Sequence, residues 1–152
     1  MKLVIGLGVH AMGDDSIGLR LAEAIAERGL DQGFEVASIP QDAFQLLSYF
    51  ADDREGLLLL DCVRFGGKPG DFVVFPPDDV ESQKVLGRIT THEGDVLKVM
   101  ELARQLDLPL PRIRILGIEP ESTGQSLELS KTLAARFDEY LAAAIRTITD
   151  NW

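Results

Sequence analysis

Residues 2–25 read KLVIGLGVHAMGDDSIGLRLAEAI, and they hold the beginning of an α/β fold. Residues 2–6 form a short apolar run that is typical of a buried strand. After a glycine-rich stretch, Ile17, Leu21, Ala24 and Ile25 recur at the i, i+4, i+7 and i+8 spacing of an amphipathic helix. The segment therefore predicts a strand, a tight turn and a helix in succession.

The rest of the chain repeats this alternation. The apolar patterns predict further strands over residues 34–39, 57–60, 72–75 and 113–118, and helices over residues 42–50, 96–103 and 133–144. The strand at 72–75 is assigned to a sheet edge, because Pro76 and Pro77 would interrupt a central ladder. We predict one α/β domain over residues 1–152, a three-layer sandwich whose mostly parallel, twisted sheet is flanked by helices on both faces.

Composition narrows the classes of partner. The chain has 152 residues, 45% of them hydrophobic, and a net charge of −10, which argues against an extended nucleic-acid surface. The single cysteine, Cys62, cannot form an internal disulfide, and we find neither a secretory leader nor an apolar segment of membrane-spanning length. We expect a cytoplasmic protein that binds neither nucleic acid nor membrane.

Three side chains form a candidate site. Asp15 follows the first strand, Asp61 ends the apolar run LLLL, and His92 lies in a later polar stretch. Ligands of parallel sheets bind at the carboxyl ends of the strands, where these residues are expected to converge. Oxygen ligands with one imidazole suit a divalent metal such as nickel or zinc. The alternatives are that Asp14 or Asp15 caps the following helix and that His92 is an ordinary surface histidine.

A nucleotide site is the first competing interpretation. The stretch from Gly6 to Ala11 matches the dinucleotide fingerprint G-x-G-x-x-G/A after a strand. However, Asp14 and Asp15 stand where a pyrophosphate needs a positively polarised helix N-terminus, and the second strand ends in Ser38-Ile39-Pro40 without the acidic residue expected for a ribose. A nicotinamide or flavin cofactor is therefore disfavoured.

Established hydrolase signatures are missing. The chain contains no G-x-S-x-G elbow, and His92-Glu93 is not followed by the second histidine of H-E-x-x-H. Cys62 could act as a nucleophile with His92 as its base, but no nucleophile signature surrounds it. We interpret Cys62 as a buried structural thiol.

The ordered motifs resemble one known family. They are GLGVHAMGDDSIG (residues 6–18), LLLLDCV (57–63), THE (91–93) and GIEPEST (117–123) followed by LELS (127–130). Together they are similar to the hydrogenase maturation endopeptidases, which cleave the C-terminal extension from the large subunit of nickel-iron hydrogenases. The motifs run in the family's order across almost the whole chain, and this ordered set is more specific than any single motif.

The resemblance implies a function and its residues. It implies that Asp15, Asp61 and His92 are the catalytic and nickel-contacting residues of a peptidase. The nickel would belong to the substrate, the hydrogenase large-subunit precursor, so that no permanently bound cofactor is expected. A weak site in the free protein would be useful, because a protease that kept its own nickel could not check the substrate's.

The sequence departs from the family pattern in two places. Val9 stands where the family usually has asparagine, and the second strand runs into Pro40-Gln41-Asp42 without the usual D-G-G-T-like turn. His10 is a candidate replacement for the missing polar group, although a solvated loop histidine is the simpler interpretation. These departures leave two alternatives: a non-catalytic module that recognises a nickel site, and, from the glycine-rich loop, a small nucleotide-binding protein.

Overall fold

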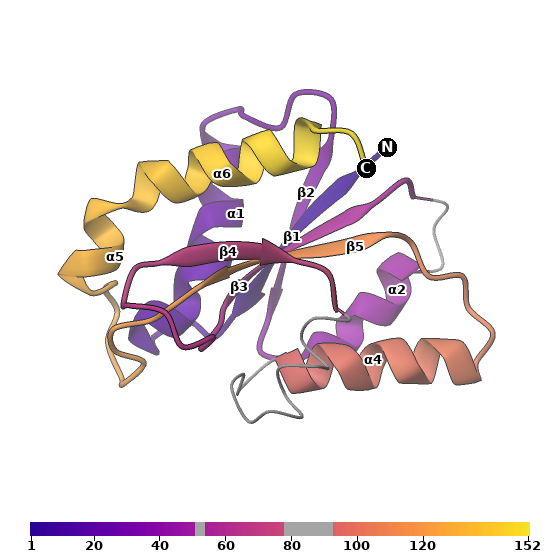
Figure 1. Ribbon diagram of the computed structural model, residues 1–152, viewed down its shortest axis with the longest axis horizontal. Coiled ribbons are helices and arrows are strands. Elements are labelled where there is room, and N and C mark those ends of the chain that lie inside the picture. Colours follow the sequence, from indigo (N-terminus) through magenta and orange to yellow (C-terminus); the bar gives the residue numbers. More distant parts are fainter. Residues whose placement is uncertain (51–53, 78–92) are drawn as a thin grey trace.

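One sheet organises the computed structural model, which describes residues 1–50, 54–77 and 93–152 (Figure 1). Within these residues the sheet has five strands in the order β2-β1-β3-β5-β4, and only β4 runs antiparallel to its neighbour. The strands are β1 (Leu3–Gly8), β2 (Glu35–Pro40), β3 (Leu57–Cys62), β4 (Phe72–Phe75) and β5 (Ile113–Ile118). A mostly parallel sheet with an antiparallel edge strand is thus the core of the fold.

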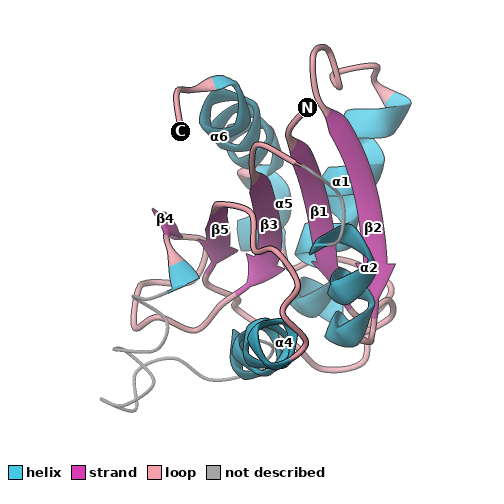
Figure 2. Ribbon diagram, turned by 90° about the vertical axis from the view of Figure 1, so that its right-hand side faces the viewer, coloured by secondary structure: helices cyan, strands magenta, loops and turns pink. Residues whose placement is uncertain are grey.

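Helices cover both faces of this sheet (Figure 2). On one face lie α1 (Ile17–Glu27), α5 (Lys131–Ala135) and α6 (Phe137–Thr149), and on the other lie α2 (Leu47–Phe50) and α4 (Glu93–Gln105). Two short 3₁₀ turns, η1 (Gly13–Ser16) and η2 (Ala43–Leu46), precede α1 and α2. The predicted α/β class with helices on both faces is confirmed.

Strand β3 shows why the sheet lies at the centre. Leu57 and Leu59 point into the core beneath α2 and α4, whereas Leu58 and Leu60 point into the core beneath α1 and α6. All four leucines are fully buried, as the uninterrupted apolar run predicts for a central parallel strand. Burying one leucine side chain contributes roughly 1.5–3 kcal/mol, so β3 anchors both layers.

Most predicted elements are confirmed, and two differ. The helix predicted over residues 42–50 is two pieces, η2 and α2, and the carboxylate of Asp42 accepts from the amide of Phe44 at its start, 2.9 Å away. The closing helix predicted from residue 133 is also divided, into α5 and α6, with Ser130 capping the first piece. The side-chain periodicity continues through both breaks, and it therefore does not reveal them.

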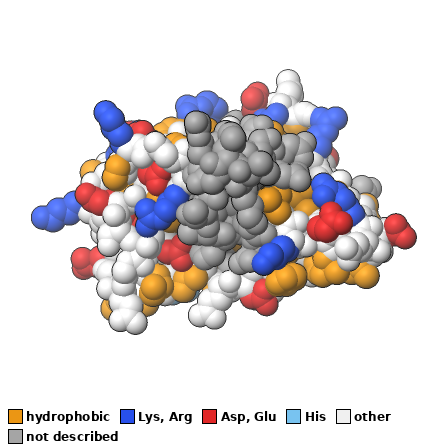
Figure 3. Space-filling model, turned by 60° about the horizontal axis from the view of Figure 1, so that its bottom comes forward, with side chains coloured by type: hydrophobic (Ala, Val, Ile, Leu, Met, Phe, Trp, Pro, Cys, Tyr) orange, Lys and Arg blue, Asp and Glu red, His pale blue; other side chains and the backbone are white. Residues whose placement is uncertain are grey.

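Two further predictions concern the surface. No helix among the described residues is long and apolar enough to cross a membrane. On the face shown in Figure 3, basic and acidic side chains are scattered among hydrophobic and other ones in the part of the surface that is described.

Candidate active site at the carboxyl edge of the sheet

The strand order places a switch point between β1 and β3. After β1 the chain moves to β2 on one side, and it then returns to form β3 on the other side of β1. Open parallel sheets bind their ligands at such points, beyond the carboxyl ends of the strands. Asp15 lies in the turn that follows β1, and Asp61 lies near the carboxyl end of β3, so the fold brings both to this switch point.

Close backbone packing joins these two segments. The turn η1 that carries Asp15 contacts β3 directly. Three residues after Asp15, a methyl group on Gly18 would lie 2.1 Å from the carbonyl oxygen of Leu60, the residue that precedes Asp61. Only glycine allows helix α1 to approach β3 so closely. The segments that carry Asp15 and Asp61 therefore pack against each other at this rim of the sheet.

The environments of the two carboxylates differ. Asp61 is 1% exposed, and its Oδ1 accepts a hydrogen bond of 2.8 Å from the amide of Cys62. Asp15 is half-buried, and its backbone closes the loop: its amide donates to the carbonyl of Met12, and its carbonyl accepts from the amide of Val9, both at 3.2 Å. A buried carboxylate beside a half-buried one, on a rigid rim, is suited to binding a cation or an electron-poor centre.

The glycines of the first loop serve packing. A methyl group on Gly6 would meet the carbonyl oxygen of Gly18 at 2.3 Å, and one on Gly8 would meet the carbonyl oxygen of Asp15 at the same distance. Backbone carbonyls of α1 and η1 thus lie where side chains at positions 6 and 8 would be. The glycine pattern is explained without a nucleotide, and this geometry argues against the nucleotide-binding alternative.

Asp14 has a role that the sequence did not reveal. Its side chain is fully buried, with Oδ2 accepting from the amides of Glu121 and Ser122 (2.9 and 3.0 Å) and Oδ1 accepting from the amide of Ser130 (2.8 Å). The N-cap of α1 is instead Ser16, whose hydroxyl donates to the carbonyl of Gly13. The helix-cap interpretation of Asp14 is therefore wrong: this carboxylate fastens the loop after β5 to the loop after β1.

Glu119 fastens the third loop in the same way. It directly follows β5, is 5% exposed, and its Oε1 accepts from the consecutive amides of Phe65, Gly66 and Gly67, each at 3.0 Å. These amides belong to the loop after β3, which begins just beyond Asp61. A carboxylate at the end of a buried apolar strand needs hydrogen-bond partners such as these. The same sequence pattern, an acidic residue that ends an apolar run, led to the choice of Asp61 as a candidate, and it also applies to Glu119.

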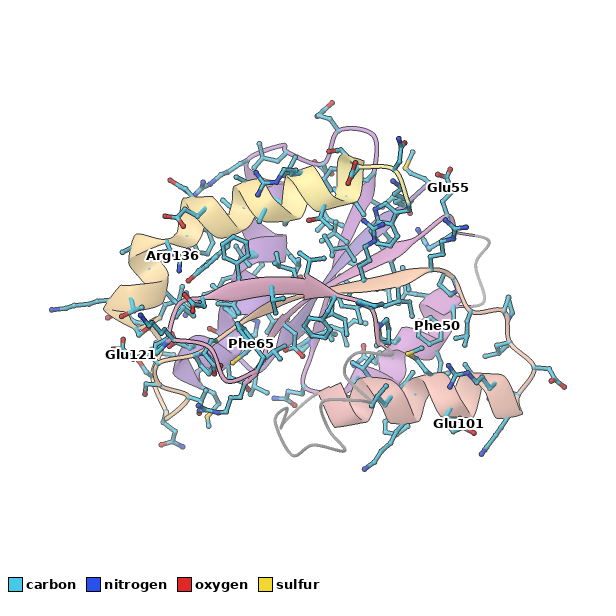
Figure 4. All side chains as sticks on the ribbon, in the orientation of Figure 1. Phe50, Glu55, Phe65, Glu101, Glu121 and Arg136 are labelled. Carbon is cyan, nitrogen blue, oxygen red and sulfur yellow. The ribbon has the colours of Figure 1, made fainter. Side chains whose placement is uncertain are left out.

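These contacts gather at one edge of the sheet. Figure 4 shows Glu121 and Phe65 toward the left of the molecule, while Glu55 and Phe50 lie toward its right. The loops after β1, β3 and β5 are thus held together by two buried carboxylates, Asp14 and Glu119. Asp15 and Asp61 sit on a rim whose backbone is pre-organised, which is a requirement for precise chemistry.

The other predicted residues have mixed outcomes. His92, the third member of the predicted trio, lies outside the described residues. His10 is exposed, with its Nε2 3.5 Å from Oε1 of Glu23 on α1, as a solvated loop histidine would be. Cys62 is 2% exposed within the core cluster, which agrees with a structural thiol. Among residues 1–50, 54–77 and 93–152, no three His, Cys, Asp or Glu side chains form a group able to hold a metal ion.

Comparison with known sequences identifies related proteins. The family model described as hydrogenase maturation protease matches residues 19–147. The hydrogenase expression/formation protein HupD of Rhodobacter capsulatus is 27% identical over 150 residues, covering 96% of this chain and 70% of that protein. The hydrogenase 3 maturation protease of Escherichia coli K12 is 28% identical over 124 residues, covering 80% and 74%.

Solved structures share the fold. The hydrogenase maturating endopeptidase HybD from Escherichia coli superposes with a TM-score of 0.78 at 23% identity, covering 96% of this chain and 92% of that one. The [NiFe] hydrogenase maturation protease HybD from Thermococcus kodakarensis gives a TM-score of 0.81 at 24% identity, covering 97% and 99%. At these identities the likeness concerns the arrangement of the sheet and helices.

Proposed function

Because the chain belongs to the hydrogenase maturation protease family and is a peptidase, we propose that it removes the C-terminal extension of a nickel-iron hydrogenase large-subunit precursor after nickel insertion. The observation that carries the proposal is the placement of Asp15 and Asp61 on adjoining segments at the switch point between β1 and β3. The names of the relatives support hydrogenase maturation, and the carboxylate pair supports a site that engages a metal.

The nickel in this proposal belongs to the substrate. Asp15, Asp61 and His92 contact the nickel that the precursor carries, and they hold the scissile bond beside it. Carboxylate oxygens and an imidazole nitrogen are suitable partners for this borderline metal. Such an arrangement lets the protease distinguish a nickel-loaded precursor from an empty one, because only the loaded precursor completes the contacts.

The departures at Val9 and Gln41 do not leave the rim unsupported. The amide of Gln41 donates to the carbonyl of Gly8 at 2.8 Å, and the amide of Val9 donates to the carbonyl of Asp15 at 3.2 Å. Backbone bonds thus supply the bracing that a side chain at position 9 would give. This bracing favours an active protease over the non-catalytic module as the function of the chain.

Cleavage of a nickel-loaded precursor tests the proposal. We expect the wild-type protein to shorten the precursor at its C-terminal end, and Asp15→Asn, Asp61→Asn and His92→Ala each to reduce kcat/KM by at least 100-fold. Asn keeps the oxygen that accepts from the amide of Cys62, so Asp61→Asn is expected to fold, which thermal unfolding checks.

Two matched variants serve as controls. Asp42→Asn alters an exposed carboxylate that binds a loop amide, and His10→Ala removes the exposed histidine beside Glu23. Both are expected to cleave at the wild-type rate. A precursor that stays intact with the wild-type protein while forming a stable complex with it would contradict the protease and favour the binding module.

A further inference from the structure

Leu127 is unusually exposed for a leucine in an ordered loop. It is 78% exposed, the highest value for a large hydrophobic side chain in the part of the chain that the structure describes. It lies in the loop after β5, next to Ser126, which pairs with Met12 of the loop after β1. Leu127 therefore stands beside the loop that carries Asp15.

The backbone on both sides of Leu127 is fixed. The side chain of Arg20 on α1 donates to the carbonyl of Leu127. The amide of Ser126 donates to the carbonyl of Ala11, and its carbonyl accepts from the amide of Gly13, both at 3.0 Å. The hydroxyl of Ser126 also accepts from the amide of Glu128 at 3.1 Å. A loop with this many backbone bonds holds its outward side chains in a defined place.

The same loop is closed underneath by Asp14. Its buried carboxylate takes amides from both ends of the loop, Glu121 and Ser122 at the start and Ser130 at the end. Single exposed leucines are common on protein surfaces, and exposure alone carries no meaning. What distinguishes Leu127 is a side chain left in water on a backbone that is held rigid at the rim of the active site.

We propose that the loop of residues 121–130 is a preformed docking surface for the protein substrate, with Leu127 as its apolar anchor. This proposal rests on the proposed function: the loop binds the same protein substrate, beside the site at which it is cleaved. Rigid apolar anchors lose little conformational entropy on binding, and they supply much of the affinity of an interface. Leu127 accordingly enters an apolar pocket on the large-subunit precursor.

Leu106 provides a matched control. It is 56% exposed and directly follows α4. Because the chain runs from there to the start of β5, Leu106 lies at the amino-terminal edge of the parallel strands, opposite to the edge that carries Asp15. Leu106→Ala removes the same atoms from a comparably exposed leucine that is far from Asp15. Because both side chains are exposed, neither truncation is expected to shift the thermal unfolding midpoint by more than about 1–2 °C.

Binding and cleavage of the nickel-loaded precursor are measured with the wild type, Leu127→Ala and Leu106→Ala. We expect Leu127→Ala to raise both Kd and KM about tenfold with kcat unchanged, and Leu106→Ala to match the wild type. A Leu127→Ala protein that binds within twofold of the wild type would overturn the docking surface.

The two readouts separate this inference from the proposed function. If the wild type binds the precursor without cutting it, the protease proposal fails, while the Kd of Leu127→Ala still decides the docking surface. If the wild type cuts the precursor and Leu127→Ala keeps the wild-type Kd and KM, only the docking surface fails. A wild type that neither binds nor cuts the precursor overturns both.

Discussion

Asp14 and Asp15 are neighbours with opposite tasks. Asp14 is fully buried and satisfies three backbone amides, whereas Asp15 is half-buried at the rim of the switch point. The buried Asp14 thus holds the loop in place, and Asp15 lies on that loop at the rim. This division explains why two consecutive carboxylates occur in a turn before a helix, where one would suffice for capping.

Asp14→Asn tests the supporting role. An asparagine offers one acceptor oxygen, so its amide group must face either the amide of Ser130 or the amides of Glu121 and Ser122. The orientation that keeps the two hydrogen bonds from Glu121 and Ser122 is favoured over the one that keeps only the bond from Ser130. We therefore expect faster hydrogen exchange at the amide of Ser130 and a loss of about 1–3 kcal/mol in the free energy of unfolding.

Asp42→Asn is the control for that measurement. Its single loop bond, from the amide of Phe44, is preserved by the remaining oxygen, and its free energy of unfolding should change by less than about 0.5 kcal/mol. Unchanged exchange at Ser130 in Asp14→Asn would contradict the assigned role of Asp14.

Gln41 occupies a backbone conformation that favours glycine. Its φ is 69° in the turn after β2, where the family's glycine-containing turn is missing. A side chain there costs about 1 kcal/mol or more, so Gln41→Gly is expected to raise the free energy of unfolding by roughly 0.5–1 kcal/mol. Ser38→Gly in β2 should lower it by a similar amount in the same urea titration. Equal losses in both variants would contradict the strain at Gln41.

At the scale of elements, helix α1 determines how the site is assembled. Gly6 and Gly18 allow its first turns to lie against β1 and β3, and this close contact places Asp15 beside the end of β3. On the same face of the sheet, Tyr140 of α6 donates to the carbonyl of Gly70 at 2.7 Å. Burial raises the pKa of this hydroxyl above its ordinary value, so that it stays a protonated donor further into the alkaline range.

Gly18→Ala tests the seating of α1. The added methyl group would lie 2.1 Å from the carbonyl oxygen of Leu60 and 2.3 Å from that of Leu7, and both are backbone atoms in central strands. We expect the free energy of unfolding to fall by about 3 kcal/mol or more, together with loss of cleavage. Gly124→Ala, which meets no atom within 4 Å, should leave the free energy of unfolding nearly unchanged.

At the scale of the whole molecule, periodicity predicted most of the fold. The runs at residues 57–60 and 113–118 and the apolar face of α1 are buried because their own spacing demands it. Strand ends then placed Asp15 and Asp61 at one edge. The position of Glu119 at the end of an apolar strand was a usable signal, but its partners and those of Asp14 were not predictable, because they are amides of loops that meet only in the folded chain.

Recognition of the substrate's nickel is tested most directly by comparing nickel-loaded and nickel-free forms of the same large-subunit precursor. If Asp15, Asp61 and His92 contact the substrate's nickel, the wild-type protein should shorten the loaded form and leave the empty form intact, with a ratio of kcat/KM values above about 100. Equal cleavage of both forms would show that the protease does not distinguish the nickel-loaded precursor, and it would contradict contact of Asp15, Asp61 and His92 with the nickel.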